Sequence, residues 1–212
     1  MSDRLSPELL LSGYAQGIFP MAESREDTRL YWFEPQQRGI IPLDGLHISR
    51  SLARRLRSGE YRVTINRAFR ATVEGCAARE ETWINGPLFA LYDQLHAAGF
   101  AHSLEVWRAG ELVGGIFGVT LGGAFFGESM FSRTTDASKI ALVHTVDRLR
   151  RAGFTLFDTQ YLTPHLASLG GIEIPRDNYK NWLAEALQID ADFAAPAIDD
   201  AYSVLQRMTQ TS

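Results

Sequence analysis

The sequence predicts an α+β fold in which helices flank a mixed β-sheet. Three apolar segments near the middle of the chain, joined by short turns, predict an antiparallel meander. A helix with a capping residue at its start is expected over residues 136–151, and a buried-looking strand over residues 154–159. Because a strand reached through a helical crossover usually lies parallel to its neighbour, the sheet should be mixed.

The first helix of the chain is expected over residues 7–16. Ser6 is a good cap for its start, Pro7 is tolerated in a first helical turn, and Gly17 is a natural end. The chain then leaves this helix in an extended segment, because Pro20 cannot continue it.

The rest of the front section contains a charged loop over residues 23–29 and a short strand over residues 30–33. So few residues cannot bury a core of their own. We therefore expect a small N-terminal domain, residues 1–38, packed on a main domain, residues 39–212.

The first half of the main domain mixes helices and strands. Hydrophobic periodicity and the residues at segment ends predict helices on either side of an early strand, followed by the meander. The expected ranges are 49–59, 67–79 and 87–98 for helices, 61–65 for the early strand, and 102–107, 111–119 and 123–126 for the meander.

Length and composition fit an ordinary globular protein. The chain has 212 residues, of which 45% are hydrophobic, and it shows no repeats or low-complexity segments. No apolar run reaches the about 18 residues that a membrane helix needs, and the N-terminus, Met1-Ser-Asp-Arg, lacks the pattern of a signal peptide. We expect a soluble, cytoplasmic monomer.

The residues that commonly bind metals are few and scattered. Cys76 is the single cysteine, so it cannot form an intrachain disulfide. It lies at helical spacing with Phe69 and Val73 and is expected in the core. The five histidines show neither His-x3-His nor His-Glu-x-x-His spacing. We therefore predict no metal site.

The net charge of −4 has the wrong sign for a protein that binds nucleic acid over its whole surface. Any contact with RNA must come from a local patch. Arg50, Arg54 and Arg57 recur at i, i+4 and i+7, so they share one face of the predicted helix over residues 49–59. This face is either an RNA contact or the solvated face of an amphipathic helix.

Polar residues interrupt the apolar pattern at the ends of two predicted strands, where burial is costly unless they bind something. Asp158 and Gln160 are two residues apart on a strand, so their side chains should point the same way and act on one object. Glu128 lies on a strand otherwise suited to burial. A buried carboxylate is either functional or paired with a cation such as Arg133.

A set of short blocks runs through most of the chain. In order, they are Gly17-Ile-Phe-Pro20, Leu46-His-Ile-Ser-Arg-Ser51, Glu81-Thr-Trp-Ile84, Ala101-His-Ser-Leu-Glu-Val-Trp107, Gly127-Glu-Ser-Met-Phe-Ser-Arg133, Asp158-Thr-Gln160 and Ala167-Ser-Leu-Gly170. Together they resemble the bacterial leucyl/phenylalanyl-tRNA-protein transferase family, and their common order is specific. One departure is Met21, where many members have a tryptophan.

The resemblance implies a main domain similar to the GNAT acyltransferases, which combine a meander, a helix and a further strand. It also implies transfer of Leu or Phe, with Met as a further candidate, from aminoacyl-tRNA to proteins that begin with Arg or Lys. Such a tag marks proteins for N-degron proteolysis. Because the reaction converts an ester into a more stable amide, no cofactor is expected.

The resemblance also assigns roles to residues. It implies that Asp158 and Gln160 lie at the reaction centre, where the carboxylate orients the amide that holds the attacking amine; the substrate could instead supply its own proton path. Glu128 is implied to contact the aminoacyl-adenosine or the amine. The bland alternatives are an ion pair or helix cap for Asp158 and solvent exposure for Gln160.

Further residues are expected to bind the substrates. The resemblance implies an apolar pocket of Phe125, Met130 and Phe157, an adenosine surface that includes Tyr14 and Trp83, to which Tyr92 could add a stacking ring, and tRNA contacts by Arg50, Arg54 and Arg57. Periodicity alone predicts core positions for the pocket residues. The other aromatic rings could instead pack the front section on the main domain.

Three rival functions are weighed against this one. The first is an aminoacyl-tRNA-dependent transferase of different specificity. The second is a CoA-dependent GNAT, which is disfavoured because the turn over residues 131–137 has no glycine to cradle a pyrophosphate. The third is a non-catalytic RNA-binding module, which would need neither Asp158 nor Gln160.

Overall fold

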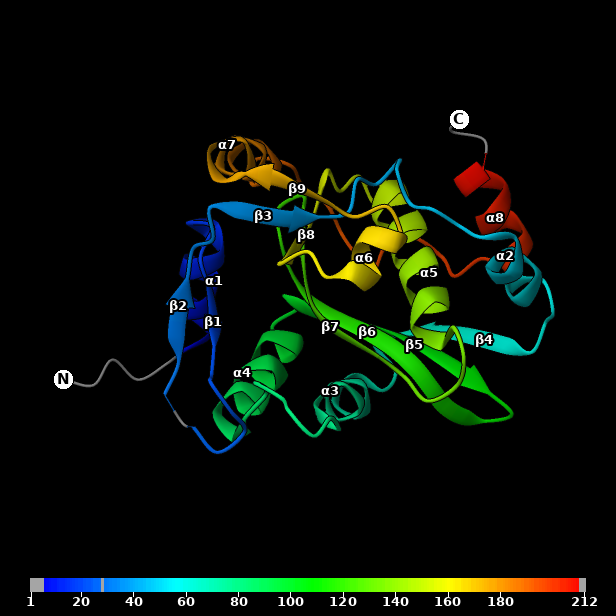
Figure 1. Cartoon of the computed structure of the whole chain (residues 1–212), viewed down its shortest axis with the longest axis horizontal. Coiled ribbons are helices and arrows are strands. Elements are labelled where there is room, and N and C mark those ends of the chain that lie inside the picture. Colours follow the sequence, from blue (N-terminus) through cyan, green and yellow to red (C-terminus); the bar gives the residue numbers. More distant parts are fainter. Residues whose placement is uncertain (1–5, 28, 210–212) are drawn as a thin grey trace.

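A seven-stranded mixed sheet forms the centre of the protein, and a separate two-stranded sheet lies beside it (Figure 1). The computed structural model describes residues 6–27 and 29–209. The strands are β1 (Phe19–Met21), β2 (Tyr31–Phe33), β3 (Gln37–Ile40), β4 (Tyr61–Ile65), β5 (Ala101–Arg108), β6 (Glu111–Leu121), β7 (Ala124–Ser132), β8 (Leu156–Gln160) and β9 (Ile172–Pro175). The large sheet has the order β4-β5-β6-β7-β8-β3-β9, while β1 pairs with β2.

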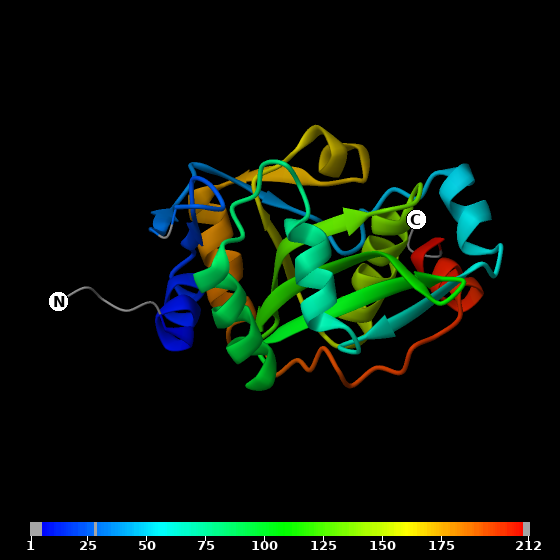
Figure 2. The same ribbon diagram turned by 90° about the horizontal axis from the view of Figure 1, so that it is seen from below.

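Helices cover both faces of the large sheet. They are α1 (Pro7–Ala15), α2 (Arg50–Leu56), α3 (Phe69–Ala77), α4 (Gly86–Ala97), α5 (Ala137–Arg151), α6 (Pro164–Ser168), α7 (Arg176–Ala186) and α8 (Ala201–Thr209). In Figures 1 and 2, α3 and α4 pack on one face of the strands β5 to β7 and α5 packs on the other. The α+β class with flanking helices is therefore confirmed.

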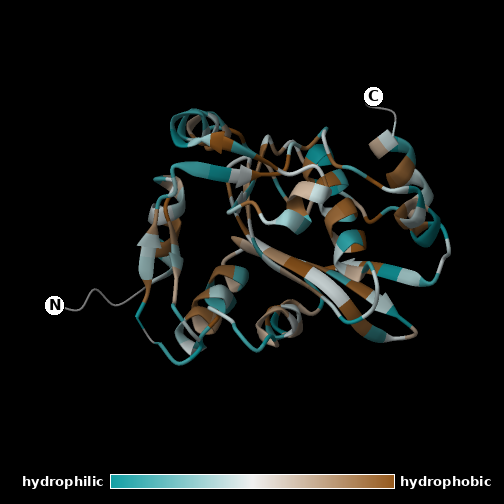
Figure 3. Cartoon of the chain, in the orientation of Figure 1, coloured by the Kyte–Doolittle hydropathy of each residue, from teal (hydrophilic) through white to brown (hydrophobic). Residues whose placement is uncertain are grey.

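The core fills both sides of the sheet, and Figure 3 shows hydrophobic residues concentrated in the central strands and in α5. On one side, Val73 and Cys76 of α3 pack with the buried residues of α4. On the other, Val143 and Val146 of α5 pack with Phe125. Cys76 is buried and free, as predicted.

The predicted meander and crossover are both present. β5 pairs antiparallel with β6, and β6 with β7. The chain then crosses through α5 and returns as β8, which pairs parallel with β7. β7 is longer than the predicted strand over residues 123–126, and this extension carries Glu128.

A β-bulge in β7 displaces Glu128 from the regular ladder. Phe117 of β6 lies opposite Ser129, and the next residue of β6, Gly118, lies opposite Gly127. Glu128 is therefore the extra residue of the bulge and has no partner on β6. Gly118 has no room for a side chain, because a Cβ atom there would lie 2.4 Å from the carbonyl oxygen of Phe126. A bulge re-aims one side chain away from the sheet's regular alternation.

The edge of the sheet beyond β8 was not predicted. β3 pairs antiparallel with both β8 and β9, so a strand from the front of the chain enters the main sheet. The predicted domain boundary at residue 38 falls within this strand. The division into residues 1–38 and 39–212 stays a prediction.

The remaining elements of the front section lie close to their expected positions. α1 begins after Ser6, whose hydroxyl accepts a hydrogen bond from the Leu9 N–H, and β2 matches the predicted strand over residues 30–33. β1 lies in the segment that was expected to be extended, whereas α6, α7 and α8 were not predicted. Residues 1–5, on which the signal-peptide argument rests, and residue 28 lie outside the described residues. No helix in the described part of the chain is long and apolar enough to span a membrane.

Candidate active site

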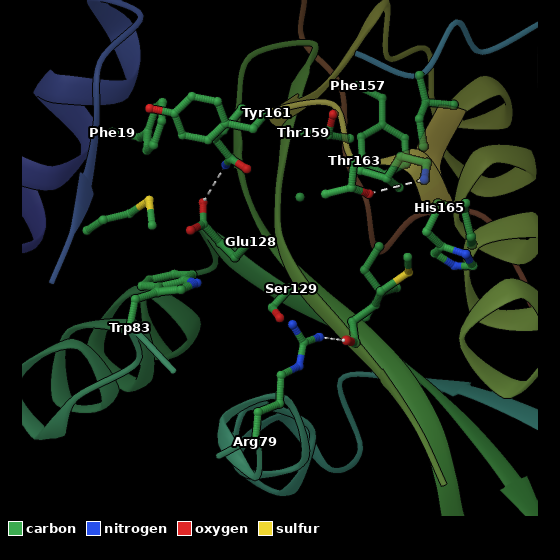
Figure 4. Close-up of a pocket in the computed structure, with 18 of the residues that line it drawn as sticks. Phe19, Arg79, Trp83, Glu128, Ser129, Phe157, Thr159, Tyr161, Thr163 and His165 are labelled. Carbon is green, nitrogen blue, oxygen red and sulfur yellow. Dashed lines mark hydrogen bonds between the residues drawn. The ribbon is translucent and has the colours of Figure 1, made fainter. Parts of the chain in front are cut away.

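A cavity of about 480 Å³ lies where β7 and β8 diverge (Figure 4). The two strands pair only as far as Phe126 and Asp158, and the residues beyond this pair line the cavity. Figure 4 shows Trp83 and Glu128 on one side of the cavity and Phe157 and His165 on the other. Most of the wall is apolar, with contributions from β1, α5 and α6.

Glu128 is the acidic side chain on the wall of this cavity. The hydroxyl of Tyr14 donates a hydrogen bond to its Oε1 at 2.7 Å, and the hydroxyl of Tyr92 donates to its Oε2 at 2.8 Å. Burial raises the pKa of Glu128 to about 7, although the two tyrosine hydrogen bonds act in the opposite direction. Glu128 can therefore exist in either protonation state near neutral pH.

Burial, together with the nearby charge of Glu128, raises the pKa of Tyr14 and of Tyr92 well above the ordinary tyrosine value. Both hydroxyls keep their protons and act as donors. Both rings are fully buried and do not line the cavity, so neither offers a face to a base. Of the aromatic residues assigned to adenosine, Trp83 lines the cavity.

Asp158 is fully buried and does not line the cavity. Its carboxylate accepts two hydrogen bonds from Arg38, at 2.8 and 2.6 Å, and one from the hydroxyl of Tyr179 at 2.8 Å. Arg38 also donates to the carbonyl oxygen of Gly17 at 3.0 Å. This buried ion pair joins β8, β3, α7 and the front section of the chain.

Gln160 ends β8 with a φ of 60°, in the left-handed region that non-glycine residues seldom adopt. Its backbone N–H donates to Asp158 Oδ1 at 2.8 Å. Because the backbone leaves the extended conformation at this residue, the side chains of Asp158 and Gln160 face different surroundings. The prediction that they point the same way is therefore wrong. Gln160 faces the cavity, whereas Asp158 faces Arg38.

The side-chain amide of Gln160 lies between Glu128 and two carbonyl oxygens. Its hydrogen bonds are satisfied when Nε2 donates to the carbonyl oxygens of Gly127 at 3.0 Å and Thr159 at 2.9 Å. The amide oxygen then faces Glu128, from which it can accept a hydrogen bond only when the carboxyl group is protonated. A direct hydrogen bond between the two side chains therefore depends on the proton of Glu128.

Gly39 makes the conformation of Gln160 possible. It lies opposite Gln160 in the pairing of β3 with β8. A Cβ atom at Gly39 would lie 2.6 Å from the backbone nitrogen of Leu162, so only glycine lets the chain turn across β3 at this point. The turn brings Tyr161 and Thr163 to the cavity wall.

Comparison with known proteins decides the family. The model of the leucyl/phenylalanyl-tRNA protein transferase family matches residues 40–184, and the model of its N-terminal domain matches residues 3–36. The chain belongs to this family. The relatives below share its name and extend over nearly the whole chain.

Curated proteins named leucyl/phenylalanyl-tRNA protein transferase are similar to this chain. The protein of Cereibacter sphaeroides is 63% identical over 209 residues, which cover 98% of each chain. That of a Ruegeria species is 61% identical over 208 residues, or 98% of this chain and 99% of its own. That of Paracoccus denitrificans is 59% identical over 213 residues and covers both chains completely.

In this transferase, two of the three predicted pocket residues face the cavity. Met130 and Phe157 line it. Phe125 lies behind the wall, where its ring packs edge-on against Phe157 and stacks on Phe193. Phe125 therefore supports the wall. Met21 also lines the cavity.

α2 lies on the far side of α5 from α6 (Figure 1). Arg50, Arg54 and Arg57, in α2 and at its end, are exposed, and no side-chain contact with another described residue gives them a role in the fold. Their neighbour Arg55 instead donates to Asp136 at the start of α5, at 3.0 Å. Arg133 does not pair with Glu128, since its guanidinium donates to the carbonyl oxygen of Leu112 at 3.0 Å.

The partners that hold the site together leave no local signal in the sequence. Arg38 lies 120 residues from Asp158 in the sequence, and no periodicity links them. Tyr179 lies in α7, which was not predicted. No cluster of possible metal ligands occurs among the residues that the structure describes.

Proposed function

We propose that this protein is an aminoacyltransferase that moves a leucyl or phenylalanyl group from tRNA to the α-amino group of a protein that begins with Arg or Lys. One observation carries the proposal. Glu128 and Gln160 lie together on the wall of an otherwise apolar cavity, in a chain that belongs to the transferase family. Such a site can hold an apolar side chain and orient a polar reacting group beside it.

The apolar part of the cavity is suited to the transferred side chain. Met130, Phe157 and Leu142 line it. A thioether adapts its shape, while an aromatic ring supported by Phe125 keeps its position. Burying a leucyl or phenylalanyl side chain there contributes roughly 2 kcal/mol of binding free energy, without a requirement for one exact shape.

The reaction itself needs orientation and one proton transfer. The acceptor amine attacks the ester carbonyl, a C–N bond forms, the C–O bond to the ribose breaks, and a proton passes from the amine to the ribose oxygen. The Gln160 amide can hold the amine or the ribose hydroxyl, and Glu128 in its ionised form can accept a hydrogen bond from the amine. Asp158 acts indirectly, because it fixes the backbone of Gln160.

The route of the proton has two candidates. It can pass through the pair of Glu128 and Gln160, whose hydrogen bonding changes with the protonation state of the carboxyl group. Alternatively, the substrate can transfer its own proton within the reacting complex. A role for the pair would add a pH dependence near the pKa of Glu128.

CoA remains the less suitable donor. The turn over residues 131–137 precedes α5 at the place where the acyltransferases with CoA bind a pyrophosphate, and it has no glycine to let its backbone approach one. The exposed face of Arg50, Arg54 and Arg57 is the proposed contact for tRNA phosphates.

The test is a transfer assay with labelled leucyl-tRNA or phenylalanyl-tRNA and short peptides as acceptors. We expect label in peptides that begin with Arg or Lys and none in matched peptides that begin with Asp. Labelled acetyl-CoA serves as the rival donor. Transfer from acetyl-CoA, or no transfer from either charged tRNA, would refute the proposed function.

A further inference from the structure

A second hollow of about 390 Å³ adjoins the cavity. The two share Arg79, Met130 and His165 on their walls. The second hollow is also lined by Arg133, Ser132 and Ser138, and none of the described residues on its wall is acidic. In a chain with a net charge of −4, this is a local concentration of positive and hydroxyl groups.

The basic side chains of the hollow come from three separate elements. Arg79 follows α3, Arg133 follows β7, and His165 lies in α6. All three are exposed. The Arg79 guanidinium donates to the carbonyl oxygen of Met130 at 2.5 Å, which fixes it at the boundary between the two hollows. A guanidinium has further N–H groups that can bind an anion.

The start of α5 connects the wall of the hollow with α2. Ser138, on its wall, lies in the first turn of α5. Two residues earlier, Asp136 binds Arg55 of α2 at 3.0 Å and Lys139 of α5 at 2.9 Å, so its charge is compensated by two cations. Figure 1 shows α2 beside α5. The hollow and α2 thus approach each other at the start of α5, where the cations Arg55 and Lys139 lie.

We propose that Arg79, Arg133 and His165 bind the phosphates of the single-stranded 3′ end of the aminoacyl-tRNA, between α2 and the reaction centre. This inference rests on the proposed function. A 3′ end that delivers its ester to the cavity must bring its last phosphates to the cavity's edge, and each phosphate carries a negative charge. Arginine forks match phosphate oxygens bidentately.

The same surface is unsuited to the acceptor. A protein that begins with Arg or Lys carries a cationic side chain next to its α-amine, and two guanidinium groups repel it. The acceptor must therefore approach the cavity from another side. This separation lets both substrates occupy the site together, as a direct transfer requires.

The experiment compares two donors that differ in phosphates. One is the phenylalanyl ester of adenosine, which has none, and the other is the phenylalanyl ester of the trinucleotide CCA, whose internucleotide phosphates would meet the hollow. The variants are Arg133→Met, which keeps much of the side chain's length, and His165→Asn. The matched control is Arg62→Met, on the outer strand β4.

We expect the ratio of kcat/KM for the trinucleotide donor to that for the adenosine donor to fall about tenfold in Arg133→Met. His165→Asn should lower the ratio by a smaller factor, and Arg62→Met should leave it unchanged. With full-length tRNA, Arg133→Met should reduce the slope of log Kd against log salt concentration by about 0.7, as expected for one lost phosphate contact on a single strand.

Two outcomes overturn the inference. In the first, Arg133→Met lowers transfer from both donors equally or changes neither. In the second, it raises the KM of the acceptor peptide and leaves the donor ratio intact, which would place the acceptor in the hollow. Failure of the wild-type protein to transfer from any donor would instead refute the proposed function, so the two failures are distinguishable.

Discussion

The backbone N–H of Gln160 donates a hydrogen bond to Asp158 Oδ1 at 2.8 Å, while the side chains of the two residues face different surroundings. Asp158 faces the buried guanidinium of Arg38, and Gln160 faces the cavity. The carboxylate thus positions the glutamine through the main chain and leaves the side-chain amide facing the cavity. This arrangement separates a structural role from a chemical one, and the two can be tested independently.

Asp158→Asn should destabilise the fold. The substitution leaves the buried charge of Arg38 without its counter-ion, and breaking a buried ion pair in this way costs about 3 kcal/mol of unfolding free energy. Urea denaturation measures the loss. Arg108→Gln, which breaks an exposed pair with Glu60, is the control and should change stability by less than about 1 kcal/mol. Equal effects for the two variants would contradict a structural role for Asp158.

Gln160→Gly should abolish most of the transfer activity and preserve binding of tRNA. Glycine suits the φ of 60° at this position, so the variant removes the amide without adding backbone strain. We expect kcat to fall by about 10²-fold or more, with the Kd for aminoacyl-tRNA changed by less than about twofold. Single-turnover kinetics and a filter-binding assay measure the two quantities. Unchanged transfer would show that the Gln160 amide has no part in the reaction.

Glu128→Gln should remove a pH dependence from the transfer reaction. Since burial raises the pKa of Glu128 to about 7, kcat of the wild-type protein should rise through pH 7 as the carboxylate forms and accepts a hydrogen bond from the amine. In Glu128→Gln this limb should disappear and kcat at pH 8 should be lower. Glu111→Gln, at an exposed turn, should retain the wild-type profile. A limb that persists in Glu128→Gln must belong to another group.

The same carboxyl group should also affect stability with pH. Its folded pKa lies above the unfolded value of 4.5, so the native state favours the protonated form. Its stabilising contribution is complete below about pH 4.5 and is lost as the pH rises through 7. Glu128→Gln should therefore lose less stability than the wild-type protein between pH 5 and pH 8 in the same urea titration.

His144→Leu should make the fold less sensitive to acid. Burial lowers the pKa of His144 to about 4, so the unfolded chain takes up a proton near pH 6.5 before the native state does, and stability is lost as the pH falls from about 6.5 to 4. The drop in unfolding free energy between pH 7 and pH 5 should shrink by about 2 kcal/mol in the variant. The exposed His47→Gln is the control. An unchanged drop in His144→Leu would mean that the pKa of His144 is the same in the native and unfolded states.

Much of the central fold was predictable because its signals are local. Short turns and apolar alternation identified the meander from β5 to β7, and the helical crossover predicted the parallel pairing of β8. The strands β3 and β9, which lie beyond β8, could not be placed in the same way. Both are short, and the pairings of β3 with β8 and with β9 join distant parts of the chain.

The sequence indicated which residues form the site better than it indicated how their side chains are arranged. Glu128 and Gln160 do face one cavity, and Asp158 lies beside them. The alternation rule failed because Gln160 leaves the extended conformation and because Glu128 is an added residue in its strand. The pairing of Tyr14 and Tyr92 with Glu128 was likewise invisible, since hydrogen bonds between distant segments leave no periodic pattern.

The bulge at Glu128 has a consequence for how the protein can vary. Every other residue of β7 already has its partner on β6, so a chain that lacked Glu128 could close the ladder without turning any neighbour to the opposite face. The acid is in effect a one-residue insertion into a sheet that is complete without it. Loss of this single codon should therefore yield a protein that folds and is inert.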